Sequence, residues 1–361
     1  MNSTGGNTRA VTPVSDYTVV TLGINSALQI LKGARDEGFR TMVAAVTGRT
    51  DLYERYDFID EVVELAGYHG FRAALEERLS PERGIVVPHT SFLGKLGTGD
   101  VDALTLPYFG NRRILRWEVD RARTRDWLAL AGVNVPRQFH AAAEIDCPVV
   151  VTARGGMRRQ GYFFARNRRE FERKVRDFQA RDYTVQEYII GVPVMLHYFQ
   201  SPLDGVLQFM GADKRYQTNV DSLGRIPTEN QAGLGIEPSY VTVGNFPLVL
   251  RESMLTTVYR LGEGIVAASR TLAPPAGLYG AFSVEAIIAP NQQFFIIELT
   301  TTISGATNLY IDGSPYSQLF YDEPMSLGRR TAREIKCAIT QGRLGDVIDG
   351  YQPFATGKDR V

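Results

Sequence analysis

Two glutamates near the end of the chain, Glu285 and Glu298, are candidates for holding a divalent cation. They lie in two β-rich runs, GAFSVEAII and QFFIIELTT, on either side of the turn signal Ala289–Gln293, which predicts a β-hairpin. If the turn is symmetric about Asn291 and Gln292, Glu285 lies directly opposite Glu298. Like charges across a ladder repel, whereas Mg²⁺ takes carboxylate oxygens and completes its shell with water and substrate phosphates. The pattern indicates a metal site, and an exposed sheet face with two solvated glutamates is the alternative.

Side chains alternate between the two faces of a strand, so the hairpin has a predicted core face and a predicted ligand face. The core face carries Phe282, Val284, Ala286, Ile288, Phe295, Ile297 and Leu299. The ligand face carries Ala281, Ser283, Glu285, Ile287, Ile296, Glu298, Thr300 and Thr302. Both glutamates are therefore expected to point away from the core.

Composition bounds the rest of the chain. Its 361 residues exceed what one hydrophobic core usually supports, which predicts two or three subdomains. The 40 basic and 40 acidic residues balance without long runs of one sign, which argues against a nucleic-acid or membrane partner. No apolar run approaches the about 20 residues of a membrane span, and Cys147 and Cys337 lack metal-type spacing. We expect a soluble cytoplasmic protein, with a disordered polar tail over residues 1–16.

The first part of the chain alternates strand and helix patterns, which predicts a parallel, doubly wound sheet. The predicted strands are Tyr17–Leu22, Thr41–Val46 and Gly84–Val87. The predicted helices are Ala27–Glu37 and, further on, Trp117–Ala131. Because ligands gather at the carboxyl ends of parallel strands, the loops that follow them are candidate ligand loops. These loops are Gly23–Ser26, Gly48–Thr50 and Pro88–Phe92.

A second unit begins near Val133 and contains a loop rich in glycine and arginine between two strand patterns. This loop, Ala153–Gln160 (ARGGMRRQ), has the composition of a flap that covers phosphates, because glycine lets backbone N–H groups approach oxygens. A basic hairpin tip is the alternative. The apolar strand Tyr183–Ile190 then ends at Gly191-Val192-Pro193, which predicts a hinge between subdomains.

Other polar residues have structural interpretations. The isolated histidines His89, His140 and His197 are not expected to be catalytic. The arginines that begin the last predicted helix, Arg329, Arg330 and Arg333, are expected to form salt bridges on the helix surface.

Five segments carry a resemblance to a known family. They are TLGINSALQILKGARDEGF, GRTDLYERYDFIDEVV, FGNRRILRWE, IEPSYVTVGNFPLVLRESML and ATNLYIDGSPYSQLFYDEPMSLGRRTAREIKCAI. From about Tyr17 to Gly350 the chain resembles the archaeal ATP-grasp ligases of purine synthesis, the formate-dependent 5-formaminoimidazole-4-carboxamide ribonucleotide (FAICAR) synthetases. Their reaction activates formate as formyl phosphate, which the amine of 5-aminoimidazole-4-carboxamide ribonucleotide (AICAR) then attacks.

The resemblance implies an α/β architecture, an ATP-grasp fold preceded by a Rossmann-like domain. Residues 17–131 are the expected Rossmann-like domain, 132–192 the ATP-grasp subdomain with flap and hinge, and 193–361 the subdomain with the metal site. It further implies ATP and Mg²⁺ (or Mn²⁺) as cofactors, AICAR and formate as substrates, and a homo-oligomer that is a trimer or hexamer.

The resemblance also assigns ligands to residues. The metal carboxylates fall on Glu285 and Glu298, the pair that the hairpin brings face to face. Contacts with the ribonucleotide fall on Asn25, Ser91 and Asn245, with formate near Asn25. Contacts with ATP fall on Thr152, the flap glycines Gly155 and Gly156, the hinge residues Glu187, Tyr188, Ile189 and Ile190, and Gln217, which stands where the family has a glutamate.

Three positions depart from the family pattern. Thr152 replaces a lysine that bonds ATP phosphate, Asn25 replaces a histidine that contacts the nucleotide, and Thr302 replaces an arginine suited to a transferring phosphoryl group. One catalytic arginine can contribute about 10³–10⁵ in rate. Arg154 lies two residues beyond Thr152, on the same face of a continuing strand, and could replace that lysine. Arg154 and Asn25 are the predicted catalytic residues. A solvated loop charge is the alternative for Arg154, and nothing obvious replaces the arginine lost at Thr302.

Three functional hypotheses follow. The first is an ATP- and Mg²⁺-dependent ligase that forms FAICAR. The second is a catalytically impaired relative that binds nucleotide or a true synthetase, which the three replacements suggest. The third is a ligase with another carboxylate or amine substrate, because Asn25 and Thr302 alter the reacting pocket.

Overall fold

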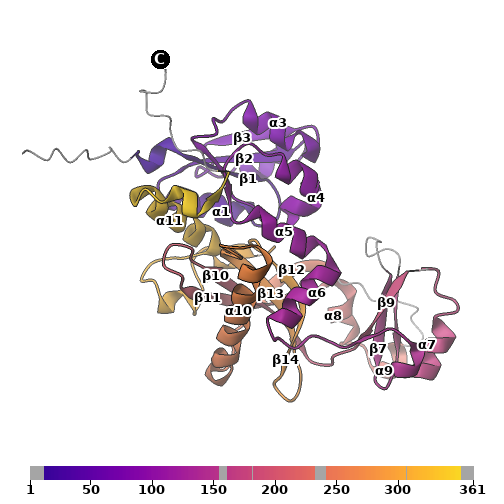
Figure 1. Ribbon diagram of the computed structural model, residues 1–361. Helices are drawn as coiled ribbons and strands as arrows, with labels where there is room; N and C mark the ends of the chain where they lie inside the picture. The colour runs from indigo at the N-terminus through magenta and orange to yellow at the C-terminus, as the bar shows by residue number, and fades with distance from the viewer. Residues whose placement is uncertain (1–11, 154–160, 181, 232–240, 306, 351–361) are drawn as a thin grey trace, which may run out of the picture.

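Three β-sheets organise the chain, as Figure 1 shows for the computed structural model. The structure describes residues 12–153, 161–180, 182–231, 241–305 and 307–350. One sheet has six strands, one has five and one has four. The six-stranded sheet lies at the top of the view, the five-stranded sheet beneath it, and the four-stranded sheet at the right (Figure 1). Most of the predicted tail is outside the described residues, and Val14–Asp16 forms a short 3₁₀ helix.

The six-stranded sheet is the predicted parallel, doubly wound sheet. Its order is β15-β5-β4-β1-β2-β3, and only β15 runs antiparallel to its neighbour. The strands are β1 (Thr18–Leu22), β2 (Arg40–Val46), β3 (Glu61–Leu65), β4 (Gly84–Val86), β5 (Tyr108–Phe109) and β15 (Ile348–Asp349). The helices of this domain are α1 (Ala27–Asp36), α2 (Thr50–Tyr53), α3 (Phe71–Glu76) and α4 (Thr90–Asp102). Every residue of β1 is buried, because a central parallel strand is covered on both faces.

The helix predicted over Trp117–Ala131 is in fact two helices, α5 (Arg112–Val119) and α6 (Arg121–Leu130). Asp120 between them is extended, and its carboxylate accepts hydrogen bonds from two N–H groups of the next turn, which starts the second helix. Trp127 of α6 is fully buried and donates from Nε1 to the Ile265 carbonyl at 2.9 Å. The end of the segment predicted as the first domain therefore contributes to the core of the five-stranded sheet.

The four-stranded sheet is antiparallel, in the order β6-β9-β7-β8. Its strands are β6 (Gln138–Phe139), β7 (Val149–Ala153), β8 (Tyr162–Ala165) and β9 (Tyr183–Glu187). One helix, α7 (Arg168–Lys174), packs on it through Phe171, which joins a small core with Val149, Val151 and Val185. The predicted flap would connect β7 and β8 in this sheet.

The five-stranded sheet is also antiparallel, in the order β12-β11-β10-β13-β14. Its strands are β10 (Val192–Gln200), β11 (Leu207–Gln217), β12 (Thr242–Pro247), β13 (Gly280–Ile288) and β14 (Phe294–Thr300). The associated helices are α8 (Thr218–Leu223), α9 (Thr228–Gln231) and α10 (Glu252–Leu272). Leu196, Phe282 and Val284 face α10 and α6 in the largest apolar core, which leaves the opposite face of the sheet for polar residues.

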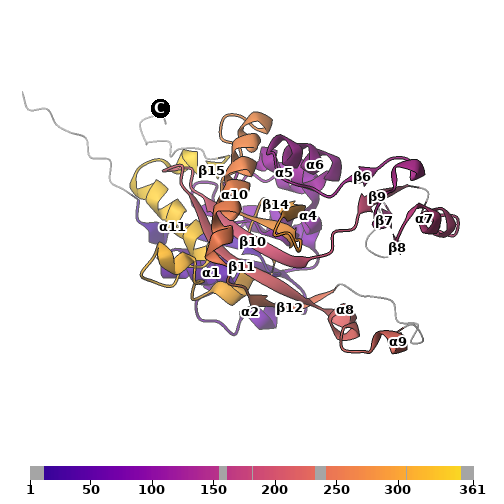
Figure 2. The same ribbon diagram turned by 90° about the horizontal axis from the view of Figure 1, so that it is seen from below.

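The last segments of the chain return to the first domain. α11 (Leu327–Thr340) lies alongside α1 in both views (Figure 1 and Figure 2), and β15 pairs with β5. Gly33 and Gly328 permit this approach, since a Cβ on Gly33 would lie 2.3 Å from the backbone nitrogen of Arg329. Part of the segment predicted as the second ATP-grasp subdomain thus completes the N-terminal domain.

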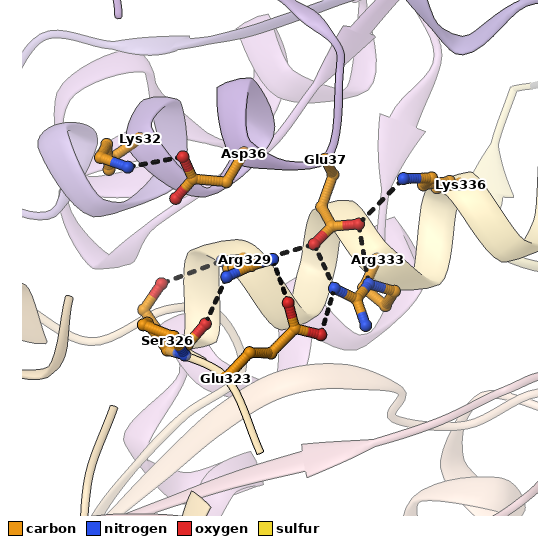
Figure 3. A network of polar contacts seen from close by, with 9 residues as sticks. Lys32, Asp36, Glu37, Glu323, Ser326, Arg329, Arg333 and Lys336 are labelled. Atoms are coloured by element: carbon orange, nitrogen blue, oxygen red, sulfur yellow. Dashed lines mark hydrogen bonds and ion pairs between the residues drawn. The ribbon is translucent and has the colours of Figure 1, made fainter. Parts of the chain in front are cut away.

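A buried carboxylate joins α1 to α11. Glu37 accepts hydrogen bonds from Arg329 at 2.8 Å and Arg333 at 2.7 Å, and Lys336 lies 3.3 Å away (Figure 3). Burial alone would raise the pKa of Glu37, but the two arginines hold it at about 2. Arg329 and Arg333 therefore form the expected salt bridges, but these bridges join two parts of the fold instead of lying along the helix surface. Arg330 forms its salt bridge with Glu334 of the same helix, but that pair is buried.

Candidate active site

β13 and β14 form the predicted hairpin, and Glu285 pairs directly with Glu298. The reason differs from the predicted symmetric turn. The loop is centred on Asn291, because the strands close with Ile288 opposite Phe294, and Ile297 is then an extra residue in a β-bulge. The off-centre loop shifts the pairing of the strands by one residue, and the bulge at Ile297 shifts it back before Glu298. The two carboxylates consequently meet across the ladder as predicted.

The bulge inverts the alternation in the outer half of β14. Phe294 and Ile296 are 2% and 1% exposed, whereas Ile297 is 39% exposed. The predicted core positions of Phe295 and Ile297 are therefore wrong, as is the predicted ligand-face position of Ile296. The predicted core positions in β13 and the inner part of β14 are confirmed for Phe282, Val284, Ala286 and Leu299.

Arg215 of β11 approaches this glutamate pair. Its Nη1 lies 3.9 Å from Glu285 Oε2, and its Nη2 donates to Ser304 Oγ at 3.1 Å. Asn245 of β12 is paired with Arg215 in the ladder, and the Asn245 Nδ2 is buried without a hydrogen-bond partner among the described residues. A guanidinium thus adjoins the carboxylates on the polar face of the sheet, and an amide donor lies beside Arg215 on the next strand.

A buried polar network lies in the same face, centred on His197 of β10. His197 Nε2 is 2.6 Å from Asp213 Oδ2, and its Nδ1 is 2.8 Å from Ser283 Oγ. All three residues are at most 1% exposed. Ser283 precedes Glu285 by two residues and Asp213 precedes Arg215 by two, so the network ties together the strands that present those two side chains.

Two loops of the first domain close on the segment after β14. Asn25 has a positive φ of 50°, which asparagine tolerates, and its Nδ2 donates to Ser91 Oγ. Ser26 Oγ donates to the carbonyl of Ser304 at 2.6 Å. The residues predicted to contact the ribonucleotide in these loops are therefore in mutual contact, and Ser304 connects them to Arg215.

Glu118 of α5 holds the residue that follows β14. Thr301 donates to its carboxylate from the backbone N–H at 2.8 Å and from the hydroxyl. Burial raises the pKa of Glu118 to about 7, against the effect of these hydrogen bonds and with a contribution from the charge of Glu298.

Thr302, where the resemblance implied an arginine, points into the protein. It is 8% exposed and lines a cavity of about 10 Å³ together with Phe109, Ala281 and Thr331. Its hydroxyl has no hydrogen-bond partner within the described part of the chain. Position 302 therefore supplies neither charge nor reach to the glutamate pair.

Residues predicted to contact ATP lie on the four-stranded sheet. Thr152 is half-buried on β7, and Glu187 ends β9 with its carboxylate 3.2 Å from Arg137 Nε. The N–H groups of Glu187 and Tyr188 donate to the carbonyls of Arg137 and Pro148 at 2.8 and 2.9 Å, so they are engaged within the subdomain. Hydrogen bonds from the predicted hinge to the adenine base of ATP would then come from other groups of residues 187–190.

The remaining predicted ATP residues are spread more widely. Ile190 is 68% exposed just before β10, and Gln217 is the last residue of β11, two positions beyond Arg215. Arg154, Gly155 and Gly156 lie outside the described residues. These assignments stay predictions.

Sequence reasoning missed Arg215, Ser304, Glu118 and the role of His197. Strand alternation alone puts Arg215 on the same face as Gln217, so that signal was present. By contrast, the contact between Ser26 and Ser304 spans 278 residues, and no local pattern indicates it.

Two family profiles match the chain. One, described as "Protein of unknown function (DUF1246)", matches residues 19–139, and the other, "Domain of unknown function (DUF1297)", matches residues 165–349. The 5-formaminoimidazole-4-carboxamide-1-(beta)-D-ribofuranosyl 5'-monophosphate synthetase of Pyrococcus horikoshii is 41% identical over 337 residues, which cover 91% of this chain and 99% of that protein. Its namesake from Methanocaldococcus jannaschii is 37% identical, over 92% of this chain and 95% of that protein. The chain belongs to the FAICAR synthetase family.

Solved structures agree with this membership. The IMP biosynthesis protein PurP of Thermococcus kodakaraensis superposes with a TM-score of 0.71 at 30% identity, over 92% of this chain and 100% of that one. The N5-carboxyaminoimidazole synthetase of Staphylococcus aureus in complex with ADP gives 0.63 at 13% identity, over 91% and 80%, which concerns the fold alone. The predicted ATP-grasp fold with a preceding Rossmann-like domain is confirmed. Among the described helices, none has the length and apolarity needed to cross a bilayer.

Proposed function

We propose that this FAICAR synthetase family member is an ATP-dependent carbon–nitrogen ligase of IMP biosynthesis, which formylates AICAR with formate and releases ADP and phosphate. The observation that carries the proposal is the face-to-face pair Glu285 and Glu298 on the polar face of the sheet. Contacts from Arg215 through Ser304 connect that pair to the loop of Asn25. A phosphate-handling site and a second substrate site would thus share one wall.

The reaction has two steps. A formate oxygen attacks the γ-phosphorus of ATP, the bond to the departing ADP breaks, and formyl phosphate forms. The amine of AICAR then attacks the formyl carbon, a C–N bond forms, the C–O bond to phosphate breaks, and the departing phosphate takes up the proton that the amine loses. Neither step requires covalent chemistry from the protein, so its contribution is positioning and charge stabilisation.

The donor set fits a Mg²⁺ site. Two carboxylates directly opposite one another repel unless a cation lies between them, and Mg²⁺ in ATP-dependent enzymes takes one or two carboxylates together with substrate phosphates. Within the ranges that the structure describes, no group of three or more His, Cys, Asp or Glu side chains could hold a metal without such help. Mg²⁺, or Mn²⁺ in its place, would neutralise charge on the phosphates.

The other assignments complete the proposal. Asn25, Ser91 and Asn245 hold the ribonucleotide. The ATP site comprises Thr152, Arg154, Gly155, Gly156, Glu187, Tyr188, Ile190 and Gln217. The contact between Asn25 and Ser91 and the unused amide of Asn245 support the first group.

The test is ATP cleavage to ADP and phosphate in the presence of Mg²⁺, formate and AICAR, with FAICAR followed by chromatography. Glu298→Gln removes one carboxylate charge and is expected to lower turnover at least about 100-fold, the scale of charge stabilisation in phosphoryl transfer. Glu252→Gln, at an exposed position at the start of α10, is the matched control. A wild-type protein that turns over no faster than the Glu298→Gln variant would refute the proposal.

The inward-turned Thr302 favours a second candidate, a non-catalytic relative that binds nucleotide or associates with a true synthetase. Calorimetry separates the two, since AICAR binding without any binding of ATP and Mg²⁺ would support this candidate.

A screen of small carboxylates for ATP turnover identifies a ligase with a different substrate. Light scattering determines whether the protein forms the proposed trimer or hexamer.

A further inference from the structure

A phosphoryl group transferred at the Glu285–Glu298 pair needs a cation from the protein, because charge on its oxygens must be stabilised in transit. Thr302 is buried and uncharged. Arg215 forms an ion pair with Glu285 of this glutamate pair. Arg215 is thus the cation already in place.

Arg215 lies further from its carboxylate partner than the arginines that bind Glu37 do. Arg329 and Arg333 have nitrogens within 2.8 Å of the buried carboxylate of Glu37. Arg215, by contrast, reaches Glu285 only at 3.9 Å. A guanidinium carries five N–H donors in a fork that matches phosphate oxygens. The loose pairing leaves donors of Arg215 available to a ligand.

The neighbour of Arg215 supplies an independent observation. Asn245 Nδ2 is buried and has no hydrogen-bond partner among the described residues, although buried amide donors are normally paired. Asn245 is the ladder partner of Arg215, so the two donors lie on one face of adjacent strands. An anionic oxygen placed between them would satisfy both.

The position of Arg215 also suits both half-reactions. On one side it contacts Glu285, and on the other it donates to Ser304, whose carbonyl accepts from Ser26 beside Asn25. We propose that Arg215 is a catalytic residue that binds the acyl phosphate between the metal pair and the ribonucleotide loops. It stays protonated throughout: the P–O bond to ADP and then the C–O bond to phosphate break while its N–H groups hold the phosphoryl oxygens.

This inference rests on the proposed ligase function, so its test has one arm that needs no turnover. Acetylphosphonate, a hydrolysis-resistant acyl phosphate mimic, is titrated calorimetrically into protein saturated with ADP and Mg²⁺. Arg215→Ala is expected to weaken acetylphosphonate binding at least about tenfold and to leave ADP binding unchanged. Lys214→Ala removes the same charge from the adjacent exposed position, on the opposite face of β11, and is expected to behave as wild type.

The second arm measures turnover with formate and AICAR. Arg215→Ala is expected to lower kcat by about 10³-fold with little change in the KM for ATP, and guanidinium added to the buffer is expected to restore part of the rate. Arg215→Lys keeps a charge without the fork and is expected to fall in between. Wild-type activity in Arg215→Ala, or acetylphosphonate affinity equal to that of Lys214→Ala, overturns the role of Arg215. An inactive wild type with Arg215-dependent acetylphosphonate binding overturns the choice of substrates and supports Arg215.

Discussion

Removing the buried charge of Glu37 is expected to loosen the junction between α1 and α11. In the folded protein Glu37 receives Arg329, Arg333 and Lys336, and its side chain is 1% exposed. The substitution Glu37→Gln keeps the shape and removes the charge. The three cations would then face one another across the junction, with Glu323 as the remaining carboxylate beside the two arginines.

The magnitude follows from the pKa of Glu37. Its fall from 4.5 to about 2 on folding, at about 1.4 kcal/mol for each pH unit, corresponds to about 3 kcal/mol of stability at neutral pH. The same order is found when one partner of a buried ion pair is removed, about 3–5 kcal/mol. We therefore expect Glu37→Gln to lower the free energy of unfolding by about 3 kcal/mol at pH 7.

The pH dependence has a definite sign. Because the folded state lowers the pKa of Glu37, the carboxylate contributes its full stability above pH 4.5 and loses it as the pH falls towards 2. The difference between wild type and Glu37→Gln should therefore be constant from pH 7 to pH 5 and shrink below pH 4.5. Glutamine resembles the protonated acid, so the two proteins converge at low pH.

Urea denaturation followed by circular dichroism, at several pH values, measures this difference. Asp36→Asn is the matched control, since Asp36 is the adjacent residue but forms a partly exposed pair with Lys32 (Figure 3) worth about 0.5 kcal/mol or less. A loss in Glu37→Gln no larger than in Asp36→Asn, or a difference that persists unchanged at pH 3, would refute the reasoning.

Two further substitutions test the packing of the fold. Gly33→Ala places a Cβ 2.3 Å from the backbone of α11, so it should lower the free energy of unfolding, measured by urea denaturation, by about 1–3 kcal/mol. The control Gly99→Ala has open space around it and should lower this free energy by less than about 0.5 kcal/mol. Equal losses would show that the helices separate freely. His197→Leu leaves the buried carboxylate of Asp213 without its imidazole partner and should lower the free energy of unfolding by about 3 kcal/mol. The control His69→Leu, at a side chain that is 88% exposed, should be nearly neutral. A loss below about 1 kcal/mol for His197→Leu would contradict the network.

Local patterns predicted the elements of the fold more reliably than their ends and neighbours. The period-two alternation of GAFSVEAII predicted the burial of Phe282 and Val284 correctly. The same alternation failed for Phe295, Ile296 and Ile297, because the bulge at Ile297 is not marked by any distinctive residue type. Asp120 shows a missed cap signal: an aspartate inside an apparently continuous helix pattern begins a new helix.

The site was only partly predictable because its members come from distant strands. The glutamate pair lies within one hairpin, so local reasoning was sufficient. Arg215 reaches that hairpin only because β10 lies between β11 and β13, an order that no sequence pattern states. Glu37 and Arg333 were each visible as charged helix residues, but their pairing depends on the return of the chain to its first domain.

That return has a consequence for how the protein is made. During synthesis the first domain emerges early, at the pace of about 5–20 residues per second, yet α11 and β15 are translated last. Until then Glu37 has no cations, and β5 presents an open edge that invites pairing with other chains. The N-terminal domain must therefore wait, incompletely folded, while the whole ATP-grasp unit is synthesised. Chains arrested before α11 should depend on chaperones or aggregate.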